Sequence, residues 1–183
     1  MEYLGSNKEI LLVGLNPTEQ ALKHGAVFCQ TNGLWRILSN STLMPRNLDI
    51  DSIPLFGEKD GKYRNYASHF FGDKTNLGFL DLVPDVYAKK GSTVKITQQH
   101  LDNFYAKLAS TKVKKVGLLG KKVTIALFPE IKNSLSYGKL NQTISIGKSQ
   151  VEVFCLPFPE TVPMKTEQKA QFYNLNNIQN AYQ

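Results

Sequence analysis

The sequence predicts a three-layer α/β/α sandwich built on a central, mostly parallel four-stranded sheet. Short apolar runs of strand length alternate along the chain with segments whose apolar residues recur at helical spacing. A glycine or proline follows each of these runs, as expected where strands end. Strands that alternate with helices favour a parallel sheet covered on both faces. The chain has 183 residues, and we expect a single domain over residues 1–183 because domains most often have about 100–150 residues.

The expected strands are residues 9–13, 77–83, 115–119 and 151–156. The last of them is the second arm of an expected hairpin, whose first arm is residues 143–146 and whose connection is residues 147–150. Between the first strand and the first helix, residues 16–32 contain Pro17 and Gly25 and show no clean period. We therefore expect a long loop there, and long loops in compact domains are often functional.

Helical periodicity is clearest at residues 98–110, where four apolar residues follow the i, i+3, i+4, i+7 spacing of an amphipathic helix. An earlier helix is expected behind Asn32, a residue type that caps helix N-termini. Two more are expected near residues 63–71 and at residues 121–127. The last expected helix is C-terminal and is marked by Phe172, Leu175, Ile178 and Tyr182.

Composition narrows the class of function. The net charge is +7, and basic small domains tend to bind polyanions. Two cysteines cannot supply the four thiolates of an iron–sulfur cluster, and the three histidines lack zinc-ligand spacing, so we expect no metal and no cofactor. No apolar stretch is long enough to span a membrane, and residues 1–8 lack the regions of a signal peptide. A cytoplasmic protein with reduced thiols and no membrane partner is expected.

The carboxyl ends of the strands are where we expect chemistry, because open α/β sheets bind ligands there. Residues 14–17, 81–85, 120–121 and 157–163 would all lie on that rim. Within the first segment, Pro17 restricts Asn16 to extended conformations and so presents its carboxamide in a fixed direction, where it could orient a water molecule. An ordinary Asn-Pro turn is the alternative interpretation.

Several short segments follow one another in a fixed order along the chain: G-L-N-P (14–17), Phe28, N-G-L-W (32–35), G-F-L-D-L-V (78–83), K-V-G-L-L-G-K (115–121) and Q-T-I-S-I-G-K-S-Q-V-E-V-F-C-L-P (142–157). Together they resemble the uracil-DNA glycosylase superfamily. The chain is most similar to the mismatch-specific uracil/thymine branch. The resemblance implies a monofunctional DNA repair glycosylase that extrudes a damaged or mispaired base from double-stranded DNA and hydrolyses its N-glycosidic bond. It would act as a monomer without a cofactor.

The resemblance also implies roles for particular residues. Asn16 matches the residue that positions the attacking water, and Phe28 matches the aromatic that stacks on the extruded base. Gly14, Leu15 and Asp81 match positions near the base, and backbone N–H groups near Leu15 and Phe28 are the expected donors to the departing anion. The loop after the last strand matches the segment that enters the minor groove. Its expected DNA contacts are Pro157, Phe158, Pro159, Glu160, Thr161, Val162 and Lys165.

This loop departs from the family pattern. Phe158 stands where the family usually has Asn, and Glu160 stands where it usually has Ser. Val162 takes the place of a leucine-like wedge. Met164 takes the place of a basic residue, whose positive charge Lys165 could supply instead. Two other functions therefore stay open: a non-catalytic nucleic-acid-binding member of the same fold, and an enzyme acting on free nucleosides or nucleotides. Binding to a duplex should weaken steeply with salt, whereas binding to a nucleoside should not.

Overall fold

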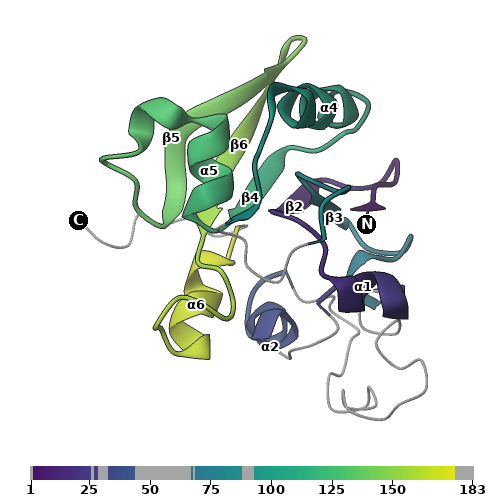
Figure 1. The fold of residues 1–183 in the computed structure, drawn as a ribbon, viewed down its shortest axis with the longest axis vertical. Helices are drawn as coiled ribbons and strands as arrows, with labels where there is room; N and C mark the ends of the chain where they lie inside the picture. Colours follow the sequence, from purple (N-terminus) through teal and green to yellow (C-terminus); the bar gives the residue numbers. More distant parts are fainter. Residues whose placement is uncertain are drawn as a thin grey trace.

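The structure is a computed structural model that describes residues 2–25, 27–28, 33–43, 67, 69–87 and 93–175. Within these residues, six strands form one sheet of order β1-β3-β2-β4-β6-β5 (Figure 1). They are β1 (Glu2–Tyr3), β2 (Ile10–Gly14), β3 (Leu77–Asp81), β4 (Lys115–Leu119), β5 (Gly138–Ile146) and β6 (Ser149–Leu156). The four central strands pair in parallel, and β1 and β5 pair antiparallel at the two edges. The predicted α/β class and the mostly parallel sheet are confirmed.

The predicted number of four strands is too small: β1 was overlooked, and the hairpin arm expected at residues 143–146 is the second half of a longer edge strand, β5, that was not counted in the sheet. β1 has only two residues, too few to show any period. In β5 the pairing with β6 shifts between Lys139 and Thr143, which breaks the strict alternation that identifies a half-buried strand. The hairpin turn is also tighter than expected, since residues 147–148 alone join the two strands. Gly147 has a φ of 57°, a conformation that glycine adopts without steric cost.

Helices cover both faces of the sheet, as the three-layer prediction requires. Alternate residues of β2 enter different clusters: Ile10 and Leu12 pack in the first, and Leu11 and Val13 in the second. The first cluster includes side chains of α2 (Gly33–Ser39) and the residues around α6 (Thr166–Phe172). The second includes side chains of α4 (Gln98–Ala109), of α5 (Lys121–Leu127) and of the 3-10 turn η3 (Pro129–Ile131).

Three helix predictions agree with the structure, whereas one loop prediction and one helix prediction do not. The helix expected behind Asn32 is α2, and those expected at 98–110 and 121–127 are α4 and α5. The long loop expected over residues 16–32 is wrong, because it contains α1 (Glu19–His24), which Thr18 caps through its side chain and Gly25 ends with a φ of 61°. The C-terminal helix was placed too late, since α6 already ends at Phe172.

Other expectations fall outside the described residues. They include Asn32 as the cap of α2, the beginning of the helix near residues 63–71, Ile178 and Tyr182. Residues 69–71 of that short helix are helical. Cys29 also lies outside, whereas Cys155 is a buried free thiol whose pKa burial raises.

The described residues also bear on membrane spans and metal sites. No helix among the described residues is long and apolar enough to cross a membrane. In the same part of the chain, no three His, Cys, Asp or Glu side chains gather in a group that could hold a metal ion.

Candidate functional site

The carboxyl ends of the parallel strands meet at one edge of the sheet. Gly14 at the end of β2 pairs with Asp81 at the end of β3, and Leu119 of β4 pairs with Leu156 of β6. The segments that follow β2 and β3 remain hydrogen-bonded beyond the ends of the strands, because the Val83 N–H donates to the Leu15 carbonyl over 2.9 Å. Residues 14–17, 81–87, 120–121 and 156–163 therefore share the edge at which the sequence placed the site.

Asn16 lies just beyond β2 and is half-buried. Its Nδ2 donates to two carbonyl oxygens, that of Pro17 at 2.9 Å and that of Val86 at 3.2 Å. Because both partners are acceptors, the nitrogen of the carboxamide must face them, which fixes the orientation of the group. Oδ1 is then the atom that can accept a hydrogen bond from water, and a carbonyl oxygen has two lone pairs for this purpose.

Asp81 is in close contact with the backbone at Gly14. A Cβ built on Gly14 would lie 2.8 Å from Asp81 Oδ1 and 2.9 Å from Phe79 Cζ, so any side chain at position 14 would displace one of these groups. The Asp81 side chain is buried. Burial disfavours its charged form and raises its pKa to about 6. Near that pH the carboxyl group can either donate or accept a hydrogen bond.

Phe28 stands over the same edge in an unusual backbone conformation. Its φ is 51°, and among the described residues it alone has a positive φ without being glycine. Strain of this kind costs about 1–3 kcal/mol and persists where the surroundings enforce it. Here the ring lies edge-on to Phe79 at 5.4 Å and to Trp35 at 6.3 Å, and Trp35 Nε1 donates to the Phe28 carbonyl at 3.2 Å. Phe28 is half-buried, so part of the residue remains open to a ligand.

The loop after β6 is held by buried side chains at α6. The Tyr173 hydroxyl donates to the Pro157 carbonyl at 2.9 Å, and Lys169 Nζ donates to the Pro159 carbonyl. Tyr173 and Lys169 are 0% and 5% exposed, and burial raises the pKa of Tyr173 well above its usual value. Sequence reasoning missed both residues. A signal existed, because a loop with three prolines needs outside donors, and residues four apart share one helical face.

The match to a known family agrees with this arrangement. The family model described as uracil DNA glycosylase superfamily matches residues 1–178. The chain belongs to the uracil DNA glycosylase superfamily. No curated protein matches the chain. Membership supports a glycosylase-type function and DNA as the partner, whereas the match does not separate the mismatch-specific branch from the others.

In this glycosylase superfamily member, Glu160 has a neighbour that the sequence did not reveal. A Cβ built on Gly33, the first residue of α2, would lie 3.1 Å from Glu160 Oε1 and 3.2 Å from Pro159 Cβ. The carboxylate thus sits at the start of α2, where a negative charge is favourable. The other loop residues expected to contact DNA differ in exposure: Thr161 and Lys165 are exposed, Phe158 and Val162 are half-buried, and Pro157 and Pro159 are buried.

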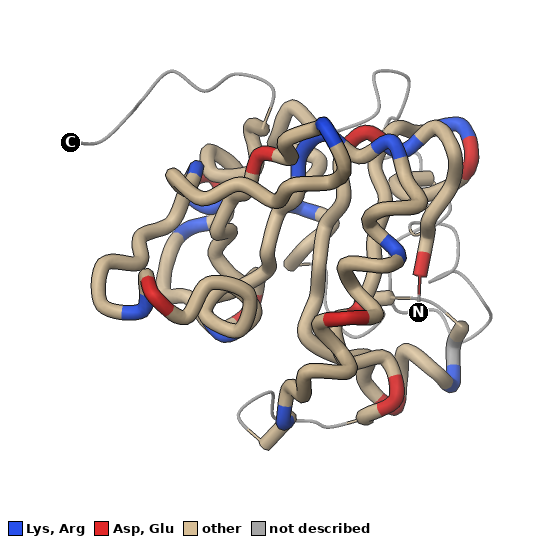
Figure 2. The backbone as a smooth tube through the Cα atoms, turned by 90° about the horizontal axis from the view of Figure 1, so that it is seen from above, with Lys and Arg blue, Asp and Glu red and all other residues tan. Residues whose placement is uncertain are grey.

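Charged side chains are spread over the described chain rather than collected in one segment (Figure 2). Several lysines are paired with acids: Lys107 with Glu2, and Lys139 with Glu152. Lys121, at the start of α5, lies 5.4 Å from the centre of the Tyr137 ring. Surface pairs of this kind contribute little stability, and the +7 charge acts as a general field that favours a polyanion.

Replacing Tyr173 tests how the glycosylase superfamily member holds its proline loop. Tyr173→Phe should lower the free energy of unfolding by about 1–3 kcal/mol, because it leaves the Pro157 carbonyl without a hydroxyl donor in a buried place. The midpoint of urea unfolding should fall with an unchanged slope. Tyr105→Phe is the control, since Tyr105 is 37% exposed on α4 and should change stability by less than about 0.5 kcal/mol. Equal midpoints for the two variants would contradict the prediction.

Proposed function

We propose that the chain is a monofunctional DNA glycosylase that removes uracil or a related deaminated or mispaired base from double-stranded DNA. It would act as a monomer without a cofactor. The observation that supports this function most directly is the fixed carboxamide of Asn16, whose nitrogen is committed to the carbonyls of Pro17 and Val86. An oriented acceptor oxygen at the ligand-binding edge of the sheet is what a hydrolytic water requires.

In the proposed reaction the base first leaves the duplex, because the bond to be cleaved is inaccessible in a stacked helix. Extrusion costs a few kcal/mol and is easiest for weakly paired bases, which gives part of the selectivity. The extruded base would stack on Phe28. Cleavage then builds positive charge on the sugar and negative charge on the base. Water held by Asn16 Oδ1 adds to the sugar carbon, and the proton that it loses neutralises the departing base anion. Backbone N–H groups near Leu15 and Phe28 would stabilise the departing base.

The loop at 157–165 would enter the minor groove and occupy the space of the extruded base. Its carbonyls are fixed by Tyr173 and Lys169, so it can be inserted without first being ordered. A preformed element loses less conformational entropy on binding than a flexible one. Lys165, exposed on this loop, would contact phosphate.

Excision of a damaged base is the direct test. Duplexes that carry one uracil, a thymine mispair, hypoxanthine or xanthine should be incubated with the protein and then treated with alkali. At least one lesion should yield an alkali-labile site, the strand should stay intact without alkali, and a chelator should have no effect. An undamaged duplex is the control. If no lesion yields an alkali-labile site, the glycosylase assignment is wrong.

A non-catalytic DNA-binding role is the second candidate, and Phe158 is the observation that favours it. Its ring lies 6.4 Å from that of Phe28 and packs against the first core cluster, so an apolar group takes the place of the polar residue usual in the family. A protein of this kind would bind duplexes with a steep salt dependence and leave every lesion in place.

A further inference from the structure

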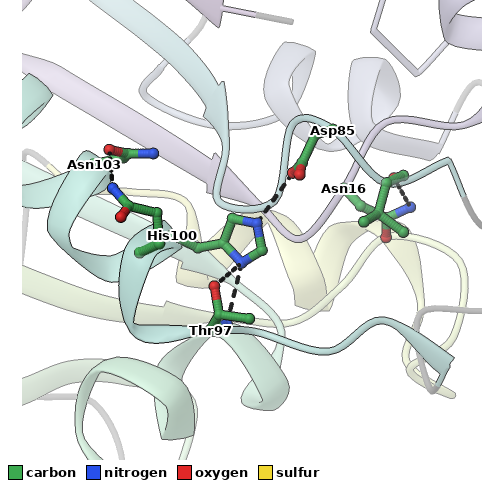
Figure 3. A network of polar contacts seen from close by, with 7 residues as sticks. Asn16, Asp85, Thr97, His100 and Asn103 are labelled. Atoms are coloured by element: carbon green, nitrogen blue, oxygen red, sulfur yellow. Dashed lines mark hydrogen bonds and ion pairs between the residues drawn. The ribbon is translucent and has the colours of Figure 1, made fainter.

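Two sets of polar contacts lie between Asn16 and helix α4: Asn16 donates to the Val86 carbonyl, and the preceding residue, Asp85, contacts His100 of α4 (Figure 3). Of its two acceptors, Pro17 is the next residue in the chain and moves with Asn16. Val86 is 70 residues away in sequence, so this hydrogen bond fixes the carboxamide relative to a different segment of the chain. The direction of Asn16 Oδ1 therefore depends on where the chain places the Val86 carbonyl.

Val86 belongs to the segment that leaves β3. Its first residues are fixed to β2, because Leu82 and Val83 donate to the carbonyls of Gly14 and Leu15, each over 2.9 Å. Pro84 follows and has no N–H to donate. The next contact along the segment is that of Asp85, whose Oδ1 lies 3.0 Å from His100 Nε2. Val86 thus lies between Asp85, which is tied to α4, and the carboxamide that it orients.

His100 can serve as an anchor because its own position and tautomer are fixed. The backbone N–H of Thr97 donates to His100 Nδ1 at 3.1 Å, so this nitrogen is the acceptor and Nε2 carries the proton that is donated to Asp85. The His100 side chain is 13% exposed. It lies in the first turn of α4, a helix of 12 residues held to the second core cluster by Phe104 and Leu108.

We infer that Asp85 and His100 are positioning residues for the hydrolytic water: their pair holds the Val86 carbonyl, and this carbonyl orients the Asn16 carboxamide. The inference rests on the proposed function. Neither residue touches the base or the sugar in this scheme. Loss of the pair should therefore slow bond cleavage and leave duplex affinity intact.

Asp85→Ala removes the pair without altering α4, and its side chain is 70% exposed, so the fold should survive. We expect the single-turnover excision rate to fall about 10-fold with an unchanged duplex Kd, since a small misplacement of a reacting group has effects of this size. Asp85→Asn keeps an acceptor for His100 Nε2–H and should restore most of the rate. His100→Glu keeps a side-chain acceptor for the Thr97 N–H but repels Asp85, and should resemble Asp85→Ala.

Two controls distinguish positioning from general damage. Asp102→Ala removes an exposed carboxylate of α4. In the described contacts this carboxylate accepts a hydrogen bond only from Gln98 of the same helix, so the excision rate should stay unchanged. Asp85→Ala added to Asn16→Ala should have no further effect, because the pair acts through Asn16. A further 10-fold loss in that background, or an unchanged rate for Asp85→Ala alone, would overturn the inference.

A readout without catalysis separates this inference from the proposed function. The side-chain amide signals of Asn16 in an NMR spectrum can be identified by their absence from Asn16→Ala. Asp85→Ala should shift them, Asp85→Asn should return them towards the wild-type position, and Asp102→Ala should not move them. If wild type excises no base and these shifts still occur, the network holds Asn16 and only the proposed function fails. If the signals stay in place, the inference fails whatever the activity.

Discussion

Replacing Asn16 by alanine should lower the single-turnover excision rate by about 10²–10³, equivalent to roughly 2.7–4 kcal/mol of transition-state stabilisation. Such a loss is typical when one oriented polar group is removed from an active site. Duplex affinity should stay near the wild-type value, because the loop at 157–165, which we propose enters the minor groove, and the general positive charge do not involve this carboxamide. The variant should fold, since hydrogen bonds such as those to the Pro17 and Val86 carbonyls are worth only about 0.5–1.5 kcal/mol each.

Asn103→Ala is the matched control. Asn103 lies exposed on α4 and accepts from Gln99, so its removal should change neither the excision rate nor the affinity. An Asn16→Ala protein that excises at the wild-type rate would show that the water is activated by another group.

Asn16→Asp distinguishes orientation from basicity. A carboxylate is a stronger base than a carboxamide, and by that criterion alone the variant would be faster. The structure predicts the opposite result. The two neighbours of Nδ2 are carbonyl oxygens, and an aspartate would replace a donor by an anion against both of them. The group should turn away, and the loss in excision rate should equal or exceed that of Asn16→Ala. A gain in rate on uracil would contradict this account.

The parts of the fold that the sequence predicts well are those with a complete period. α4 shows four apolar residues at helical spacing, and each of the four parallel strands contains a short apolar stretch. The elements that the sequence did not predict correctly are short or interrupted: α1 has six residues, β1 has two, and the pairing of β5 is irregular. In α6 the buried residues are Lys169 and Ala170, and a buried lysine removes the pattern by which a helix is recognised.

The residues of the candidate site likewise divide into those that the sequence predicts and those that it does not. Asn16, Gly14 and Asp81 could be placed at one edge, because parallel strands carry their carboxyl ends together and each residue ends or follows a strand. The groups that hold the neighbouring loops could not be found from the ends of the strands. Lys169 and His100 act on residues 10 and 15 positions away, and only the folded chain brings Val86 to Asn16. Spacing along a sequence predicts partners within one element and not between elements.

Asp81→Asn should change how stability depends on pH. The pKa of Asp81 is 3.8 in its ordinary state and about 6 in the folded protein, because burial disfavours the carboxylate. The native state therefore keeps the proton longer than the unfolded state does. Between about pH 4 and pH 6, unfolding releases this proton, so wild type loses stability as the pH rises. The difference in pKa corresponds to on the order of 3 kcal/mol, at about 1.4 kcal/mol for each pH unit.

Asparagine at position 81 is neutral at every pH and does not make this contribution. The free energy of unfolding of Asp81→Asn minus that of wild type should therefore grow by on the order of 3 kcal/mol from pH 4 to pH 7. Urea unfolding at pH 4, 5, 6 and 7 measures it. Val83→Ala, a neutral change at a fully buried residue two positions along, should lower stability by an amount that does not vary with pH. If the curves of wild type and Asp81→Asn run parallel from pH 4 to pH 7, the Asp81 carboxyl is not held in its neutral form by burial.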